Sequence, residues 1–164
     1  MTDSEFEKII IQQKEKLYRF AFSILKQKED AQDAVQEVVL KLWNKKKILN
    51  SSENLESYCM SSVKNYALDL LRKNKQHLNY KSSGLTEETE NSNIENRDLI
   101  EKMRTELQQL PVQQRMAIEL KDFQGYEYEE ISEILEMNVN AIRVNVSRGR
   151  KRLYKIFKEE LKNV

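Results

Sequence analysis

Apolar residues recur every three or four positions along most of this chain, which is the spacing of amphipathic helices. Alternating apolar and polar residues, which are typical of strands, do not appear as a run in the sequence. The pattern therefore predicts an all-α protein. The expected helices cover residues 5–27, 29–46, 53–75, a segment from residue 98, a segment from Leu110-Pro111, residues 127–136 and a segment that Asn138 caps.

One stretch interrupts the helical pattern. Residues 81–97 are rich in Ser, Thr, Asn and Glu and nearly free of apolar side chains, so they cannot bury enough surface to order themselves. We predict two small helical domains, residues 1–80 and 98–164, that a flexible acidic linker joins. Three antiparallel helices in the first domain can close a small core.

Composition and charge narrow the classes of protein further. Charged residues make up 34% of the 164 residues, yet the net charge is only +1 because opposite charges are segregated along the chain. The single cysteine, Cys59, cannot form an intrachain disulfide, which suits a reducing compartment. No apolar run approaches the ~18 residues of a membrane span. We therefore expect a soluble, cytoplasmic protein without membrane insertion.

The sign of the charge changes abruptly near the end of the chain. Residues 127–136 contain five glutamates and no basic residue, whereas residues 137–158 contain seven basic residues and no acidic one. Two helices with a short break over residues 137–140, the second helix being basic, are typical of a helix-turn-helix that reads DNA. The alternative is a basic surface helix that binds an acidic partner or keeps the protein soluble.

The exposed side of this basic helix supplies seven candidate DNA-binding residues. In a recognition helix the N-terminal turns contact base edges, and later basic residues bind phosphates. The residues that we expect near bases are Asn140, Arg143, Val144, Ser147 and Arg148, and those that we expect on phosphates are Lys151 and Arg152.

A second candidate DNA-binding face lies on the helix expected over residues 53–75. Asn65, Asp69 and Arg72 are spaced so that they share one side of that helix, with Lys64 and Lys73 beside them. An Asn amide can pair with a base edge and an Arg with a base or a phosphate. A pair one turn apart would let Asp69 hold Arg72 or Asn65 in place. The alternative is an ordinary solvated helix face.

A third candidate surface lies on the helix expected over residues 29–46. Asp33, Gln36 and Glu37 occupy the side opposite its apolar stripe. Leu40 and Trp43 leave apolar surface available for contact. This face is either a docking site for a partner helix or an ordinary polar helix surface.

Together these residues resemble the extracytoplasmic-function sigma factors of the sigma-70 family of bacterial transcription initiation factors. The Asp-Ala-x-Asp-x-Val-Gln-Glu core of residues 30–37 resembles the family's region 2.2. The Asn-x-x-x-Asp-x-x-Arg pattern of residues 65–72 resembles region 2.4. The stretches similar to region 4 are Leu110-Pro111 through Arg115, then Gly125, Tyr128 through Ile131, and Ser147 through Leu153. The motifs follow the family order and span roughly residues 5–78 and 98–160.

The resemblance implies a sigma factor that directs core RNA polymerase to promoters and melts promoter DNA. The first domain would dock on the β′ clamp helices of the polymerase through Asp33, Gln36, Glu37 and Trp43. Its third helix would recognise the minus-ten element, with Asn65 beside a flipped-out base. The second domain would bind the β flap and read the minus-thirty-five element. An anti-sigma factor is a further candidate partner, because many relatives are controlled in that way.

Several positions depart from the family pattern, among them Glu127, Gly149 and Val144. Glu127 replaces a usual Ser or Thr before the first reading helix, which weakens a helix cap. Gly149 replaces a common Ala inside the recognition helix, at a cost of up to ~1 kcal/mol. Val144 offers no hydrogen bond to a base.

Two other classes of protein compete with this interpretation. A stand-alone regulator would use a similar helix-turn-helix, with the N-terminal bundle for dimerisation or sensing, but it has no need of the region 2.2 and 2.4 motifs. An enzyme is disfavoured, since the chain has one His, one Cys, no glycine-rich phosphate loop and no metal-ligand cluster in its sequence. We therefore expect no catalytic residue, no cofactor and no metal.

Overall fold

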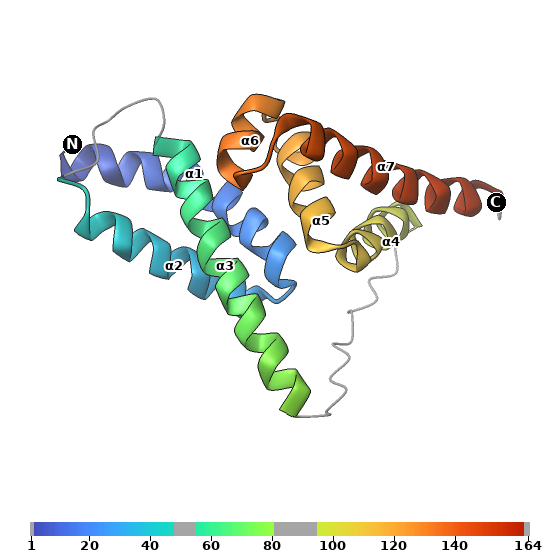
Figure 1. Cartoon of the computed structure of the whole chain (residues 1–164), viewed down its shortest axis with the longest axis horizontal. Helices are drawn as coiled ribbons and strands as arrows, with labels where there is room; N and C mark the ends of the chain where they lie inside the picture. Colours follow the sequence, from blue (N-terminus) through green and yellow to red (C-terminus); the bar gives the residue numbers. More distant parts are fainter. Residues whose placement is uncertain (1, 48–54, 81–94, 163–164) are drawn as a thin grey trace.

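A computed structural model describes residues 2–47, 55–80 and 95–162 of the chain. These residues contain helices and no strand, which confirms the all-α prediction (Figure 1). Among the described helices, not one combines the length and apolar character that a membrane crossing requires. The helices are α1 (Asp3–Leu25), α2 (Lys28–Asn44), α3 (Leu55–Tyr80), α4 (Glu95–Gln109), α5 (Val112–Ile118), the π-helical turn η1 (Glu119–Phe123), α6 (Tyr128–Leu135) and α7 (Val139–Lys162).

The expected helices are present, with ends that differ by a few residues. Residues 95–97, which we assigned to the linker, are the first turn of α4. The rest of the expected linker, residues 81–94, lies outside the described residues, as does the expected loop at Asn50-Ser52.

Helix α1 is the central element of the first helical group, because it packs more extensively against α2 and α3 than those two helices pack against each other. A capping box starts it: the Thr2 hydroxyl accepts a hydrogen bond from the Glu5 N–H, and the Glu5 carboxylate accepts one from the Thr2 N–H. It ends at Lys26, whose φ of 64° is left-handed. The predicted apolar stripe of α1 is buried, and its members are Leu17, Phe20, Ala21, Ile24 and Leu25.

The helix-turn-helix forms at the expected place. Helix α6 ends at Glu136, which has a left-handed φ of 54°, and the Ser132 hydroxyl donates a hydrogen bond to the Met137 carbonyl in the turn. The Asn138 side chain accepts a hydrogen bond of 2.7 Å from the Ala141 N–H at the start of α7. This contact confirms the predicted cap at Asn138.

Phe123 continues the apolar spacing of Met116 and Leu120 in the sequence but is 54% exposed. The cause is the π-helical turn, in which the Gln124 N–H donates to the Glu119 carbonyl five residues earlier. Such a turn adds one residue relative to the α-helical period. It therefore leaves Leu120 buried and turns Phe123 toward solvent.

The two helical groups pack against each other. Helix α6 lies on α3, and α5 lies beside α1 (Figure 1). As a result, buried side chains of both groups form one continuous apolar cluster. This arrangement was left open by the sequence, since apolar periodicity identifies the buried side of a helix but not the helix that covers it.

Gly149 allows α7 to approach α5 closely, which explains a residue that appeared unfavourable in the sequence. A Cβ atom at this position would lie 2.9 Å from Cγ1 of Ile118, which is closer than real Cβ contacts. Glycine is therefore the residue that fits between these two helices.

We predict that Gly149→Ala destabilises the protein. The helix propensity gained, up to ~1 kcal/mol, is outweighed by overpacking, which typically costs ~1–3 kcal/mol. A net loss of about 1 kcal/mol would lower Tm by roughly 2–4 °C, measurable by circular dichroism. Ser147→Ala on the exposed side of α7 is the control and should raise Tm slightly. A Gly149→Ala protein that melts at or above the wild-type temperature would contradict the packing argument.

Candidate nucleic-acid interface and docking face

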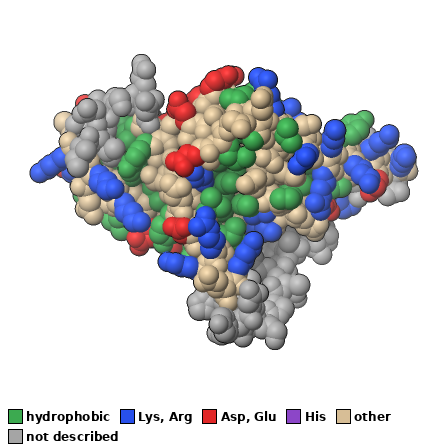
Figure 2. Space-filling view, viewed as in Figure 1, with side chains coloured by type: hydrophobic (Ala, Val, Ile, Leu, Met, Phe, Trp, Pro, Cys, Tyr) green, Lys and Arg blue, Asp and Glu red, His purple; other side chains and the backbone are tan. Residues whose placement is uncertain are grey.

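All seven predicted DNA-binding residues of α7 are exposed. Ile142 and Val146 on the opposite side are buried, and α7 packs against α5 and α6. Figure 2 shows the basic side chains along α7 toward the C-terminus and acidic side chains over α6. The exposed strip consists of Asn140, Arg143, Val144, Ser147, Arg148, Lys151 and Arg152.

Tyr128 supports the exposed strip of α7, and sequence reasoning did not assign it this role. Two cations lie near its ring: the Arg143 guanidinium is 5.2 Å from the ring centre, and the Lys121 ammonium is 4.5 Å from it. Cations at such distances are attracted to the negative face of the ring. Tyr128 therefore restrains Arg143, a residue that we expect near bases.

Arg150 is a second residue that the sequence did not single out. Its Nε donates a 3.0 Å hydrogen bond to Asp122, and this bond raises the pKa of the guanidinium. The pair joins α7 to η1 across 28 residues of sequence. In the sequence, Arg150 cannot be told apart from the other arginines of α7. The residue that holds it, Asp122, lies on another element.

The predicted polar face of α3 is largely exposed. Asn65, Asp69, Arg72 and Lys73 are all accessible. The Arg72 guanidinium lies 3.7 Å from the Asp69 carboxylate, which confirms the expected pair between these residues. Because both groups are well exposed, this pair contributes little to stability and leaves Arg72 free to change partner.

Lys64 is the exception on this face, and the prediction that it is exposed was wrong. Its exposed fraction is 5% because α6 packs over this part of α3. Its ammonium lies 4.0 Å from the carboxylate of Glu136, at the end of α6. In this arrangement Lys64 is not accessible to DNA.

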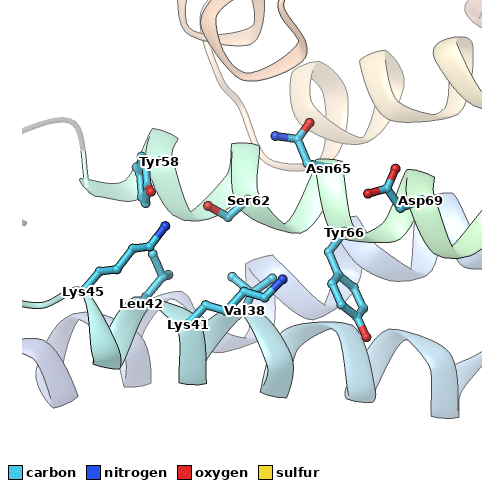
Figure 3. A pocket seen from close by; sticks show the side chains of 9 residues that line it. All are labelled: Val38, Lys41, Leu42, Lys45, Tyr58, Ser62, Asn65, Tyr66 and Asp69. Carbon is cyan, nitrogen blue, oxygen red and sulfur yellow. The ribbon is translucent and has the colours of Figure 1, made fainter.

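A pocket of about 220 Å³ lies between α2 and α3 (Figure 3). Tyr66 reaches from α3 toward α2, and Lys41 places its ammonium 5.3 Å from the Tyr66 ring centre. Burial, together with nearby Glu37, raises the pKa of the Tyr66 hydroxyl. The pocket is smaller than the ~300–1,000 Å³ sites of drug-sized ligands. Its lining residues are Val38, Lys41, Leu42, Lys45, Tyr58, Ser62, Asn65, Tyr66 and Asp69.

The predicted docking face on α2 is exposed over most of its length. Asp33, Gln36 and Glu37 are exposed, and Leu40 is 59% exposed. Trp43, the fifth of the predicted docking residues, is half-buried.

Trp43 contacts other side chains of the first helical group. Its ring packs edge-on against Phe6, with centroids 5.4 Å apart, and the Lys46 ammonium lies 3.4 Å from its centre. Part of the apolar surface that we expected to be free at Trp43 is therefore used within the chain. Leu40 is the more accessible apolar anchor on this face.

Metal-ligating side chains do not gather in the part of the chain that the structure describes. No group of three or more His, Cys, Asp or Glu side chains there is placed to hold an ion. The side chain of His77 lies outside the described residues.

Two family sequence models match this chain, in separate segments. Residues 10–77 match Sigma-70 region 2, and residues 100–153 match Sigma-70, region 4. The chain is 29% identical over 160 residues to RNA polymerase sigma factor SigV of Bacillus subtilis (strain 168), covering 93% of this chain and 91% of that protein. It is 24% identical over 159 residues to ECF RNA polymerase sigma factor SigX of the same organism, covering 88% and 81%.

Two solved structures share the fold. The first is the sigma factor RpoE in complex with the anti-sigma factor NepR from Bartonella quintana, with a TM-score of 0.74 and 23% identity over 94% of this chain and 97% of that one. The second is CnrH in complex with the cytosolic domain of CnrY, with a TM-score of 0.71 and 17% identity over 96% and 90%.

We predict that Tyr128→Leu weakens duplex DNA binding about two- to fivefold, the range expected for losing one exposed cation–π contact. Leucine keeps apolar bulk at the half-buried site but removes the ring face that restrains Arg143. Fluorescence anisotropy with labelled duplex measures the effect. Tyr154→Leu, a change at an exposed tyrosine farther along α7, is the control. Equal losses in both variants would argue against a role for Tyr128 in placing Arg143.

We predict a separate effect for Lys151→Gln. If Lys151 binds a phosphate, its loss should lower the slope of log affinity against log salt concentration by ~0.9 and leave sequence preference unchanged. Titrations at several salt concentrations measure the slope. The control is Lys14→Gln, which removes the same charge at an exposed position of α1. A slope change as large in that control would mean that total charge, rather than a phosphate contact, sets the salt dependence.

Proposed function

Because this chain belongs to the sigma-70 family of RNA polymerase sigma factors, in the extracytoplasmic-function group, we propose that it reads promoters with two separate helices, α3 and α7. As a sigma factor, it acts in promoter-specific transcription initiation. The observation that carries our assignment of residues is that the seven candidate side chains of α7 form one exposed strip.

Helix α7 would read the minus-thirty-five element in the major groove. The major groove of B-DNA is about 12 Å wide and admits an α-helix. Asn140 and Arg143 lie in the first turns of α7, where recognition helices contact bases. Lys151 and Arg152 lie two to three turns farther along, where they would bind phosphates. Specificity at Val144 would come from apolar contact, for example with a thymine methyl group.

Helix α3 and the pocket between α2 and α3 would recognise the minus-ten element. The pocket size suits one planar group rather than a larger ligand. Asn65, at its edge, would pair with a flipped-out base, and the ring of Tyr66 offers an apolar surface. Flipping one base costs a few kcal/mol of unstacking, which contacts of this kind can offset. Arg72 and Lys73 would bind the adjacent backbone.

The exposed face of α2 would dock on the β′ clamp helices of the polymerase, with Leu40 as its apolar anchor. Asp33, Gln36 and Glu37 would supply the polar contacts around it, and the accessible edge of Trp43 would extend them. The second domain would bind the β flap. One solved relative, RpoE, is in complex with the anti-sigma factor NepR, and we propose that a protein of that class regulates this chain too. The site of action would be the cytoplasm, where polymerase and DNA meet.

Two weak DNA contacts in one chain would give promoter selectivity. We propose that residues 1–80 and 98–164 act as separate domains, with the connecting segment between them. Linking two readers makes the second contact intramolecular, so joint affinity exceeds that of either reader. Run-off transcription by core polymerase on randomised promoters tests this function directly and would reveal the preferred elements.

We predict that two substitutions separate docking from melting. Leu40→Ala should weaken binding to core polymerase, because it removes the apolar anchor of α2. Asn65→Ala should leave polymerase binding intact but reduce promoter opening, which permanganate footprinting detects. Each variant serves as the control for the other.

Two different outcomes would contradict these assignments. Equal loss of docking and opening in the Asn65 variant would indicate misfolding rather than lost base recognition. Tight sequence-specific binding by the wild-type chain without polymerase would instead favour a stand-alone regulator.

A further inference from the structure

The last turn of α2 carries the single tryptophan of the chain, Trp43. Leu40 and Trp43 follow Gln36 at four and seven positions, so the three residues share one side of the helix. Gln36 and Leu40 are exposed, and Trp43 is half-buried. Trp43 therefore extends the docking face to the end of α2, with part of its ring accessible.

A side chain in the last turn of a helix is held weakly by the helix itself. Helix α2 ends at Asn44, one residue after Trp43. Helix ends open locally at little cost in free energy. The Trp43 ring can thus keep one orientation only if side chains from outside this turn hold it. The start of α1 lies beside the end of α2 and supplies two of them (Figure 1).

The first support comes from Phe6 on α1. Its ring lies 5.4 Å from the Trp43 ring, centroid to centroid, with the two planes at 69°. This edge-to-face arrangement is one that aromatic pairs prefer. Phe6 is 2% exposed and belongs to the main apolar cluster. The contact therefore fixes one part of the Trp43 ring against the core.

The second support is Lys46, in the turn that follows α2. Its backbone N–H donates to the Trp43 carbonyl at 3.3 Å, and its ammonium lies 3.4 Å from the centre of the Trp43 ring. The Lys46 side chain is only 17% exposed, and a partly desolvated cation is attracted more strongly to an aromatic face. Lys46 therefore covers the Trp43 ring from the solvent side of the turn.

Asp3, in the first turn of α1, holds Lys46 in this place. Its carboxylate accepts a hydrogen bond from the Lys46 ammonium and forms an ion pair with it. The capping box of Thr2 and Glu5 orders the turn that contains Asp3. Residues at the start of α1 thus act on a side chain about forty positions later in the sequence.

We propose that Lys46 and Asp3 are positioning residues for the docking of α2 on core RNA polymerase. With Phe6 they form a brace, by which we mean Asp3, Phe6 and Lys46, that holds the Trp43 ring in one orientation next to Leu40. The inference rests on the proposed function. It adds the first turn of α1 to the parts of the chain on which docking depends.

The brace raises affinity by ordering Trp43 before the partner arrives. Tryptophan is enriched among the residues that contribute most to protein interfaces. A side chain that becomes immobile on binding loses conformational entropy, and a side chain that is already held loses less. Loss of the brace should therefore weaken docking even though Asp3 and Lys46 make no contact with the polymerase themselves.

Lys46→Gln tests the brace in the full chain. Since Trp43 is the only tryptophan, quenching of its fluorescence by acrylamide reports how accessible its ring is in the free protein. We expect quenching to increase, and the affinity for core polymerase to fall about two- to fivefold, as for one lost cation–π contact. Lys46→Arg keeps a cation over the ring and should restore both values.

Two further variants serve as the control and as the test of Asp3. Lys47→Gln removes the same charge at the next, exposed residue and should change neither value. Asp3→Asn should act in the same direction as Lys46→Gln but more weakly, because an exposed ion pair contributes little. The double variant should be no worse than Lys46→Gln alone, since Asp3 acts through Lys46. Duplex DNA binding through α7 should be the same in all of them.

The outcomes separate the brace from the function on which it rests. Unchanged quenching in Lys46→Gln would show that Lys46 does not hold the ring, and unchanged polymerase affinity despite increased quenching would show that docking does not depend on its position. Either result overturns the proposal, as does a loss of affinity that Lys46→Arg does not restore. Failure of the wild-type chain to bind core polymerase would instead refute the proposed function, while quenching in the free protein would still decide whether Lys46 holds Trp43.

Discussion

The arrangement of the whole chain depends on a buried positive charge, the guanidinium of Arg115. A charge taken out of water is tolerated only where hydrogen bonds replace its hydration. Burial lowers the pKa of Arg115, but an arginine remains charged at any physiological pH. Two of its three carbonyl acceptors, Ser23 and Ile24, belong to α1, and the third is Leu110. The end of α1, where carbonyls lack partners within the helix, therefore completes the solvation of a residue from the other domain.

The packing of the two helical groups leaves the three candidate surfaces unequally exposed. The α7 strip and the α2 face are accessible, whereas the α3 face is covered at Lys64. Helix α6 is responsible for this difference. Its apolar side, with Ile131, Ile134 and Leu135, is buried and supports α7, while its last carboxylate faces α3. The segregation of charge in the sequence thus serves two contacts, one within the helix-turn-helix and one between domains.

Local features of the fold were predictable from the sequence, and contacts between distant segments were not. Apolar periodicity located the helices, and the burial of Ile142 and Val146 placed the α7 strip on the opposite side. The cap at Asn138 joins residues only three positions apart and was equally predictable. The burial of Lys64 and the support that Tyr128 gives to Arg143 depend on which helix meets which. Which helices pack together is seen only in the three-dimensional structure.

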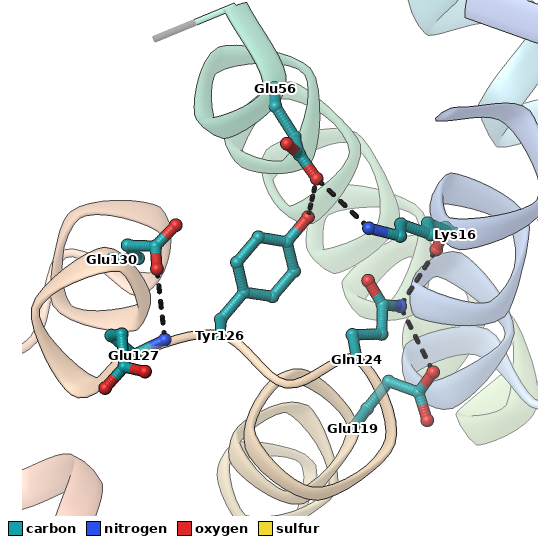
Figure 4. Close-up of polar contacts among 7 residues, drawn as sticks. All are labelled: Lys16, Glu56, Glu119, Gln124, Tyr126, Glu127 and Glu130. Carbon is teal, nitrogen blue, oxygen red and sulfur yellow. Dashed lines mark hydrogen bonds and ion pairs between the residues drawn. The ribbon is translucent and has the colours of Figure 1, made fainter. Parts of the chain in front are cut away.

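The π-helical turn links local backbone geometry to the contacts that the segment before α6 makes with α1 and α3 (Figure 4). One extra residue in this turn directs Phe123 to solvent and Gln124 toward the Lys16 carbonyl. Gly125 follows with a φ of 77°, a conformation that favours glycine. The chain then reverses so that the Tyr126 N–H bonds the Leu120 carbonyl while its hydroxyl reaches Glu56. A regular α-helix through Phe123 would shift the register of these side chains and separate Gln124 and Tyr126 from their partners. The position of α6 on α3, and with it the covering of Lys64, therefore follows from a local departure from α-helical geometry.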